Sequence, residues 1–277
     1  MRSVESETTS GAGLTRTGRT PDGRSDVESS QYARISDYAI IGDTRSAALV
    51  SRNGSIDWLC WPRFDSRSVF ARILDVEHGG FFSIRPRGGF HVKRRYLENT
   101  NVLETTFETE SGSVRLLDLM LALDESEKRK RLLPVRQLLR RLEGVEGSVD
   151  IEVIYQPRPD YARASPELEI RCKDSVWCAE GPEVWHLRSD VPFELEQEER
   201  TARSTFTVRR GERKYFALSY ETHAPAVFGN IGAAADDEIE RTIAWWKEWC
   251  TNFKFEGNYA DDVLRSALTL KLLTYAP

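Results

Sequence analysis

The chain has 277 residues, of which 40% are hydrophobic and 30% are charged, and its formal net charge at pH 7 is -5. This composition is typical of a soluble globular protein with one large or two small cores, and its acidic balance gives no electrostatic reason to expect nucleic acid or an anionic membrane as a partner. No apolar run of the sequence approaches the roughly 20 residues that span a bilayer.

The N-terminal segment differs from the rest of the chain. Residues 1–32 are rich in Ser, Thr, Gly and Arg and nearly lack large apolar side chains. Such a segment cannot bury enough apolar surface to fold, so we expect a disordered tail. The segment also lacks the hydrophobic stretch that a secretory signal requires.

A β-hairpin is the clearest local signal. Residues 46–50 predict one strand, Asn53-Gly54 predicts the turn, and residues 55–60 predict the returning strand. An Asn-Gly pair favours a tight hairpin because both residues tolerate positive φ angles. Trp61-Pro62 then ends regular pairing, because proline has no N–H group for the ladder. We expect residues 68–74 to form a short helix after the loop.

The loop after this hairpin gathers aromatic and charged side chains, and it supplies the candidate site residues. Aromatic faces beside carboxylates and guanidinium groups suit a sugar, which offers apolar C–H faces and a ring of hydroxyls. The candidates are Trp61, Arg63, Phe64, Asp65 and Ser66 of the loop, with Asp57 on the preceding strand. A structural interpretation stands beside this one. Asp57 could bond within the hairpin, and Asp65 or Ser66 could cap the short helix. Trp58 shares its strand face with two apolar residues, which favours a core position.

Strand signals dominate the chain as far as residue 220. Many short alternating segments separated by turns predict a mainly β fold, a large antiparallel β-sandwich. We expect Glu143-Gly144 to end one of these strands. The predicted strands cover residues 80–85, 90–96, 102–109, 113–120, 135–142, 149–155, 168–172, 184–187, 193–197, 205–209 and 213–220.

The period changes after residue 222. A helix begins near Ala233, and its apolar stripe is formed by Ile239, Ile243, Trp246 and Cys250. Gly257-Asn258 interrupts the pattern. A second helix follows over residues 259–275, with a wide apolar face that needs a partner. That face consists of Val263, Ala267 and Leu270 on one line and Leu264, Leu268 and Leu272 on the adjoining line.

Several ordered motifs carry a resemblance to a known family. They are Tyr38–Asp43, Gly54–Cys60, Pro62–Ser66, Arg95–Leu103 with Phe107, and Ser266–Pro277. In these stretches the chain resembles the N-terminal region of bacterial glycoside hydrolase family 15 proteins, the glucoamylase-like and trehalase-like enzymes. The resemblance implies a supersandwich, then a linker helix, then a barrel of paired helices that holds the active site.

The resemblance also implies a division of the chain. Residues 1–32 are the tail, 33–224 the sandwich, 225–256 the linker helix and 257–277 the first helix of a barrel that is cut short. Inverting hydrolysis needs two carboxyl groups roughly 6.5–9.5 Å apart, and in the family both are Glu residues of the barrel. Those stretches lie beyond Pro277, so no catalytic residue is assigned and we expect the chain alone to be inactive. Asp57 and Asp65 are the best pair within the chain itself.

The expected role is therefore that of a non-catalytic domain that braces the barrel and lends the Trp61–Ser66 loop to the sugar site. Its expected partners are an α-glucoside or trehalose-type sugar, reached through the missing barrel, and that barrel or another chain at the last helix. A stand-alone carbohydrate-binding module remains an alternative, although the strands offer few aromatics besides Trp177 and Trp185. A degenerate fragment that folds poorly is a third possibility.

Cysteine and histidine usage points to no cofactor. The four His residues are scattered, and the four Cys residues match no zinc spacing. Cys172 and Cys178 could pair across a hairpin, but buried free thiols are the more common arrangement. Free thiols agree with a cytoplasmic location.

Overall fold

Short segments of alternating apolar side chains form the strands of this chain. The computed structural model describes residues 32–124, 130, 134, 136–164, 166–172, 174–196, 198, 200–222 and 231–275. The predicted tail, apart from Tyr32, lies outside the described residues. Residues 31–277 form one compact unit. Within the described part, no helix combines the length and apolarity that crossing a bilayer requires.

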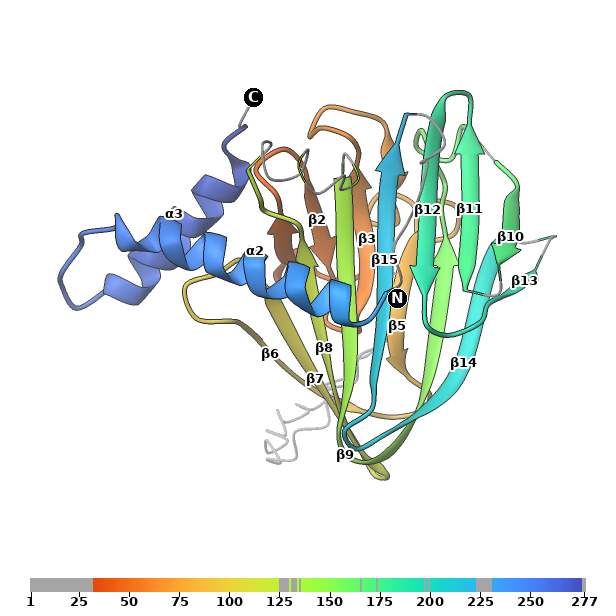
Figure 1. Cartoon of the computed structure of the whole chain (residues 1–277), viewed down its shortest axis with the longest axis horizontal. Helices are drawn as coiled ribbons and strands as arrows, with labels where there is room; N and C mark the ends of the chain where they lie inside the picture. Colours follow the sequence, from red (N-terminus) through yellow and green to blue (C-terminus); the bar gives the residue numbers. More distant parts are fainter. Residues whose placement is uncertain are drawn as a thin grey trace, which may run out of the picture. The chain divides into compact units, whose positions relative to one another are not determined.

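Antiparallel strands and two helices make up this unit (Figure 1). A short 3-10 turn, η1 (Ile35–Asp37), precedes them. The strands are β1 (Ala39–Gly42), β2 (Ala47–Val50), β3 (Ser55–Cys60), β4 (Ser68–Phe70), β5 (Phe81–Pro86), β6 (His91–Tyr96), β7 (Leu103–Thr109), β8 (Gly112–Met120), β9 (Arg136–Gln156), β10 (Leu168–Cys172), β11 (Ser175–Glu180), β12 (Glu183–Ser189), β13 (Glu194–Glu196), β14 (Thr201–Arg209) and β15 (Arg213–Glu221). The helices are α2 (Ala233–Thr251) and α3 (Ala260–Leu273).

The long strand β9 joins two layers into one continuous 15-stranded sheet. Its first half pairs with β8 and β15 and belongs to the layer β6-β7-β8-β9-β15-β12-β11-β10, which we call sheet B. Its second half pairs with β5 and β14 and belongs to the layer β1-β2-β3-β5-β9-β14-β13, which we call sheet A. The mainly β, antiparallel fold with C-terminal helices is therefore confirmed.

The expected strand end at Glu143-Gly144 is wrong, because both residues lie inside β9, which is 21 residues long. A Cβ atom at Gly144 would lie 2.0 Å from the carbonyl oxygen of Arg209. Glycine at this position therefore admits the β14–β15 turn against the strand, and the Gly144 N–H donates to the Glu212 carbonyl at 2.9 Å. The glycine marks a close backbone approach rather than a turn.

The predicted helix over residues 68–74 is also wrong. Residues 68–70 form β4, which pairs with β3 and is buried along its whole length. Asp65 and Ser66 consequently cap no helix. Val69 and Phe70 are fully buried in the core between the layers, so tertiary burial outweighs the local helical pattern.

The core between the two layers contains a buried ion pair. Arg140 on β9 and Asp118 on β8 have fully buried side chains, and Nε of Arg140 lies 2.7 Å from Oδ1 of Asp118. The same guanidinium donates to the carbonyls of Phe82 on β5 and of Gly54 in the hairpin turn, each at 2.7 Å. One side chain of sheet B thereby bonds the backbone of sheet A.

Both predicted helices are confirmed, and α2 lies across the outer face of sheet B (Figure 1). Helix α3 contacts β1 and the loop between β6 and β7. A second apolar cluster forms at this contact. It contains Val102, Leu117, Leu119, Leu121, Ala122, Leu139 and Ala217 from the sandwich and Ile239, Trp246, Leu268 and Leu272 from the helices. The predicted stripe of α2 and the line 264–268–272 of α3 are thus the faces that the helices bury.

We expect the substitution Asp118→Leu to lower the free energy of unfolding by about 3–5 kcal/mol, because it leaves the Arg140 guanidinium buried without its counter-charge. Adding Arg140→Leu should restore only part of that loss, since the carbonyls of Phe82 and Gly54 then lose their donor. Urea unfolding monitored by Trp fluorescence measures both values. Asp150→Leu, on the exposed side of β9, is the matched control. Equal stability of Asp118→Leu and Asp150→Leu would contradict a stabilising role of the Asp118–Arg140 ion pair.

Candidate functional site

The loop that follows β3 does not present all of its predicted residues to solvent. Trp61 is 1% exposed and belongs to the core between the layers, with its ring centroid 6.4 Å from that of Tyr220. The expectation that Trp61 projects from the loop is therefore wrong. Its place in the loop suggested exposure, but the indole packs into the core beside Tyr220.

A buried cation holds the base of this loop. Nε of Arg136, at the start of β9, donates to the carbonyl of Pro62 at 2.8 Å and lies 3.7 Å from the Asp43 carboxylate. Asp43 in turn accepts the N–H groups of Arg45 and Ser46 at 3.1 and 2.9 Å. The turn after β1, the first residue of β9 and the loop are thus one connected unit.

The exposed tip of the loop carries the other predicted residues. Arg63 and Asp65 form an ion pair at 3.0 Å, with 54% and 73% of their side chains exposed. The Arg63 N–H donates to Oγ of Ser66 at 3.1 Å, and Phe64 between them is half-buried. An exposed pair of this kind contributes at most about 1 kcal/mol, so a ligand could replace it at little cost.

Asp57 lies apart from this tip. Its side chain is buried and accepts the hydroxyls of Tyr38 at 2.9 Å and Ser55 at 2.5 Å. Burial raises the pKa of Asp57, although these two donors oppose the rise. The carboxylate of Asp57 is engaged inside the hairpin and that of Asp65 pairs with Arg63, so the structural interpretation accounts for the contacts of Asp57.

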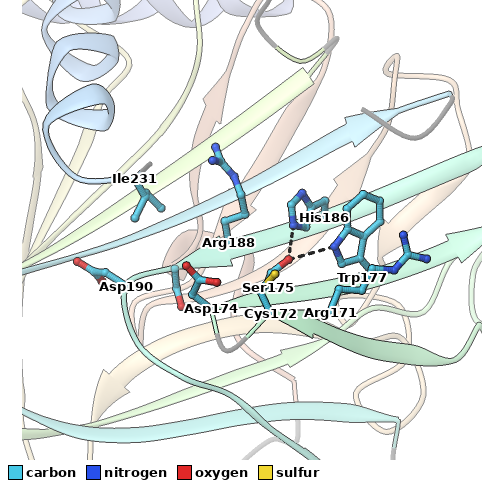
Figure 2. Close-up of a pocket in the computed structure, with 10 residues that line it drawn as sticks. Arg171, Cys172, Asp174, Ser175, Trp177, His186, Arg188, Asp190 and Ile231 are labelled. Atoms are coloured by element: carbon cyan, nitrogen blue, oxygen red, sulfur yellow. Dashed lines mark hydrogen bonds between the residues drawn. The ribbon is translucent and has the colours of Figure 1, made fainter. Parts of the chain in front are cut away.

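A pocket opens on the outer face of sheet B, at the β10–β12 side (Figure 2). Its cavity measures about 440 Å³. Lining residues are Arg171, Cys172, Asp174, Ser175, Trp177, His186, Arg188, Ser189, Asp190 and Ile231. Oγ of Ser175 lies 2.5 Å from Nε2 of His186 and accepts the indole N–H of Trp177 at 3.0 Å. Sequence reasoning named Trp177 as a strand aromatic but missed this pocket, since its residues come together only through strand pairing.

The loop between β6 and β7 holds α3 through one arginine. The guanidinium of Arg265 lies 4.1 Å from the centroid of the Tyr96 ring, donates to the Thr100 carbonyl at 2.8 Å and bonds Oδ1 of Asn101. Nδ2 of Asn101 donates to the carbonyl of Leu268 at 3.0 Å. We call Tyr96, Thr100, Asn101 and Arg265 the helix bracket.

The helix bracket was not predicted. Its loop residues lie inside the motif Arg95–Leu103, but the motif alone did not reveal a partner on the distant C-terminal helix. The available signal was Arg265 itself, a lone cation beside the apolar line Leu264–Leu268.

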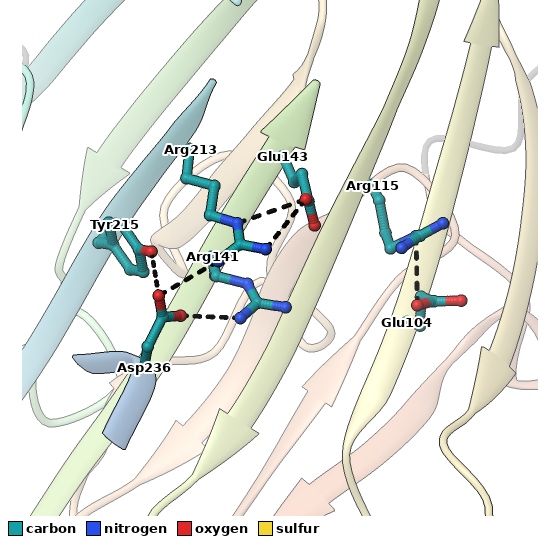
Figure 3. A network of polar contacts seen from close by, with 7 residues as sticks. All are labelled: Glu104, Arg115, Arg141, Glu143, Arg213, Tyr215 and Asp236. Atoms are coloured by element: carbon teal, nitrogen blue, oxygen red, sulfur yellow. Dashed lines mark hydrogen bonds and ion pairs between the residues drawn. The ribbon is translucent and has the colours of Figure 1, made fainter. Parts of the chain in front are cut away.

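A second polar contact fixes the first turn of α2 (Figure 3). Asp236 accepts the Tyr215 hydroxyl at 2.6 Å and Nη1 of Arg141 at 2.8 Å, and lies 3.4 Å from Nη1 of Arg213. Partial burial raises the pKa of Asp236, but these hydrogen bonds and positive charges outweigh it and leave the pKa lowered. A carboxylate in the first helical turn also suits the helix dipole.

Metal-ligating residue types do not gather in the part of the chain that the structure describes. There, no group of three or more His, Cys, Asp and Glu residues could hold a metal ion. All four cysteines are free, with Cys60 and Cys178 buried and Cys172 exposed. Cys178 pairs in register with Leu168 rather than with Cys172, which explains why a bridge across the hairpin does not form.

Comparison with known proteins gives one consistent result. The profile of the family described as "Trehalase-like, N-terminal" matches residues 23–224. A trehalase of Thermoplasma volcanium is 31% identical over 257 residues, covering 91% of this chain and 40% of that protein. A trehalase of Mycobacterium tuberculosis is 31% identical over 267 residues, covering 89% and 38%. The chain thus spans about 40% of the length of these relatives.

Among solved structures, a putative kojibiose phosphorylase from human microbiome aligns with a TM-score of 0.36 and 10% sequence identity, covering 84% of this chain and 35% of that one. A likeness at this level carries no argument about the present chain.

The substitution Asp236→Asn should lower the free energy of unfolding at pH 7 by about 1–3 kcal/mol, because it weakens charge-assisted hydrogen bonds. The folded-state pKa of Asp236 is lowered, so its carboxylate contributes stability above the unfolded-state pKa and loses it as the pH falls through the folded-state pKa. The difference in the free energy of unfolding between Asp236→Asn and the unchanged chain should therefore become smaller below about pH 4.

Urea unfolding at pH 7 and pH 3 measures this difference. Asp237→Asn changes the adjacent carboxylate, whose exposed ion pair with Arg241 is 3.1 Å long, and should alter stability by less than about 1 kcal/mol. A difference for Asp236→Asn that stays constant with pH would count against the role of its charge.

The substitution Arg265→Ala should release α3, because it removes two hydrogen bonds and the contact with the Tyr96 ring. We expect the amides of α3 to exchange hydrogen about tenfold faster or more, while those of β9 keep their rate. Hydrogen exchange followed by mass spectrometry measures both segments. Arg265→Lys keeps the positive charge but lacks the planar guanidinium. Its α3 amides should exchange at a rate between those of Arg265→Ala and of the unchanged chain. Unchanged exchange in α3 would rule out the bracket as its anchor.

Proposed function

Because the chain belongs to the trehalase-like N-terminal family, we propose that it is the non-catalytic sandwich of an inverting α-glucoside hydrolase of glycoside hydrolase family 15. Its relatives are named trehalases, and the chain spans about 40% of their length. The proposed task of the sandwich is to hold the helices that lead into a catalytic barrel. The proposed substrate of the whole enzyme is trehalose or a similar α-glucoside.

The observation that carries this proposal is the way α3 is held. Its line Leu264–Leu268–Leu272 packs on sheet B and α2, and the helix bracket fixes its middle. Apolar residues also remain on the other side, where Leu270 is 67% and Leu273 46% exposed. A helix that is apolar on two sides belongs between two layers, so a further layer of helices is the expected cover.

The loop after β3 is proposed to reach the sugar site. A Cβ atom at Gly42 would lie 2.7 Å from Leu272, so the turn after β1 touches the end of α3. The neighbouring Asp43 meets Arg136, which bonds the base of the loop. The loop and the end of α3 therefore lie at the same edge of the sandwich (Figure 1).

In this proposal only the tip of the loop meets sugar. Arg63, Phe64, Asp65 and Ser66 offer donors, acceptors and one aromatic edge to hydroxyls and C–H groups. Trp61 and Asp57 are buried and set the position of the loop. No catalytic residue is proposed here, because Asp57 bonds Tyr38 and Ser55 and Asp65 pairs with Arg63.

A stand-alone carbohydrate-binding module that binds sugar through exposed aromatic side chains of the strands is a weaker candidate. Trp185 is 2% exposed. Trp177 has the His186 ring stacked at 4.3 Å and the Arg171 guanidinium 4.2 Å over it, so its faces are already occupied. A cytoplasmic location remains part of the proposal, and the four free thiols support it.

The proposal is tested by assays of glucose release from trehalose and maltose. We expect no hydrolysis by the purified chain, and activity when it is mixed with a chain that carries a trehalase barrel. Arg265→Ala should reduce the recovered activity by weakening association. Phe64→Ala should reduce activity while association, measured by light scattering, stays unchanged. Hydrolysis by this chain alone would overturn the non-catalytic role, and failure of the barrel chain to associate would overturn the bracing role.

A further inference from the structure

The pocket on the outer face of sheet B is separate from both proposed contacts of the catalytic domain. Val176, Cys178 and Leu187 point into the core between the layers, so the alternate residues Trp177 and His186 face outward. The pocket is built by β10, the turn after it, β11, β12 and Ile231, whereas the helix bracket joins the β6–β7 region to α3 and the loop tip follows β3. Its volume of about 440 Å³ is within the usual range for small-molecule sites.

Charged side chains of both signs line the pocket. Arg171 and Arg188 lie with Asp174 and Asp190 in this lining, Arg171 also pairs with Glu169 at 3.0 Å, and Glu238 of α2 adds a negative charge near Arg188, so the pocket has no excess of positive charge. Figure 2 shows the two carboxylates at one end of the pocket, the ring pair of Trp177 and His186 at the other, and Arg188 between them. Carboxylates only accept hydrogen bonds and guanidinium groups only donate them. A hydroxyl does both, so a polyol satisfies both kinds of group at once.

The pocket is built to bind rather than to react. Burial, with the positive charges of Arg188 and Arg171, lowers the pKa of His186 to about 3, so the imidazole is neutral at pH 7. A base that weak does not activate the hydroxyl of Ser175, which is itself 7% exposed and held by Trp177. The Ser175–His186 contact therefore stiffens the wall of the pocket.

The apolar part of the lining suits the C–H groups of a sugar ring. Ile231 and the edge of the Trp177 indole supply this surface, because His186 and Arg171 already lie against the indole faces. The stack Arg171–Trp177–His186 is fixed before any ligand arrives, and a preformed wall reduces the entropy lost on binding.

We propose that this pocket is a second carbohydrate site, which binds a neutral mono- or disaccharide through Asp174, Asp190 and Arg188. Vicinal hydroxyls donate to the carboxylates and accept from the guanidinium, with the sugar C–H groups against Ile231 and the Trp177 edge. This site goes beyond the proposed bracing function and does not require a catalytic barrel.

Isothermal titration of the whole chain with glucose, maltose and trehalose tests the site. We expect one binding event at millimolar sugar, and a loss of affinity of about tenfold in Asp174→Asn, because hydrogen bonds to a charged group are weakened. Asp174 is exposed, so this variant should fold as the unchanged chain does. The matched control Asp261→Asn alters an equally exposed carboxylate of α3 and should bind normally.

A third variant separates this site from the loop after β3. Phe64→Ala should leave the titration of the isolated chain unchanged if the sugar lies in the pocket. Loss of binding in Phe64→Ala with normal binding in Asp174→Asn would assign the sugar to the loop and overturn this inference. Binding of glycine but of no sugar, or no binding at all, would also overturn it, and none of these results affects the assay for the bracing role.

Discussion

The guanidinium of Arg140 is the group on which the closure of the two layers depends. It is buried in the core with Asp118 beside it, and its remaining donors are taken by backbone carbonyls of the opposite layer, at Phe82 and Gly54. A buried cation is tolerated only when its charge and its donors are satisfied. The hairpin turn at Gly54 is therefore held in place by the core, and the position of β3 and of the loop behind it follows from that turn.

Strand β9, which carries Arg140, also supports both proposed contacts with the catalytic domain. Arg136 shares the inward direction of Arg140 and bonds the loop at Pro62, whereas Arg141 points outward and bonds Asp236 of α2. Three arginines within six residues of β9 thus contact the loop, the opposite layer and α2. Side chains that alternate between the two sides of one strand make this possible.

These arginines also explain where the sequence was informative and where it was not. The hairpin around Asn53-Gly54 and both C-terminal helices could be predicted, because turn chemistry and apolar periodicity are local. The stretch 135–142 alternates poorly, since Arg140 occupies a core position that only Asp118 and two distant carbonyls explain. Residues 68–74 and Trp61 were misjudged for the same reason, as burial by distant strands decided their conformation. The helix bracket and the pocket could not be predicted either, because their residues meet only in the folded chain.

Tyr215 connects the rim of the pocket to the first turn of α2. Its N–H donates to the Asp190 carboxylate at 2.9 Å, at the rim of the pocket, and its hydroxyl donates to Asp236 in the first turn of α2. A substitution of Tyr215 would therefore disturb both places together. Asp174 and Arg265 lie outside that link, since Asp174 follows β10 and Arg265 bonds the loop between β6 and β7. Sugar binding and the attachment of α3 can accordingly be tested by separate substitutions, because Asp174 and Arg265 contact different parts of the sandwich.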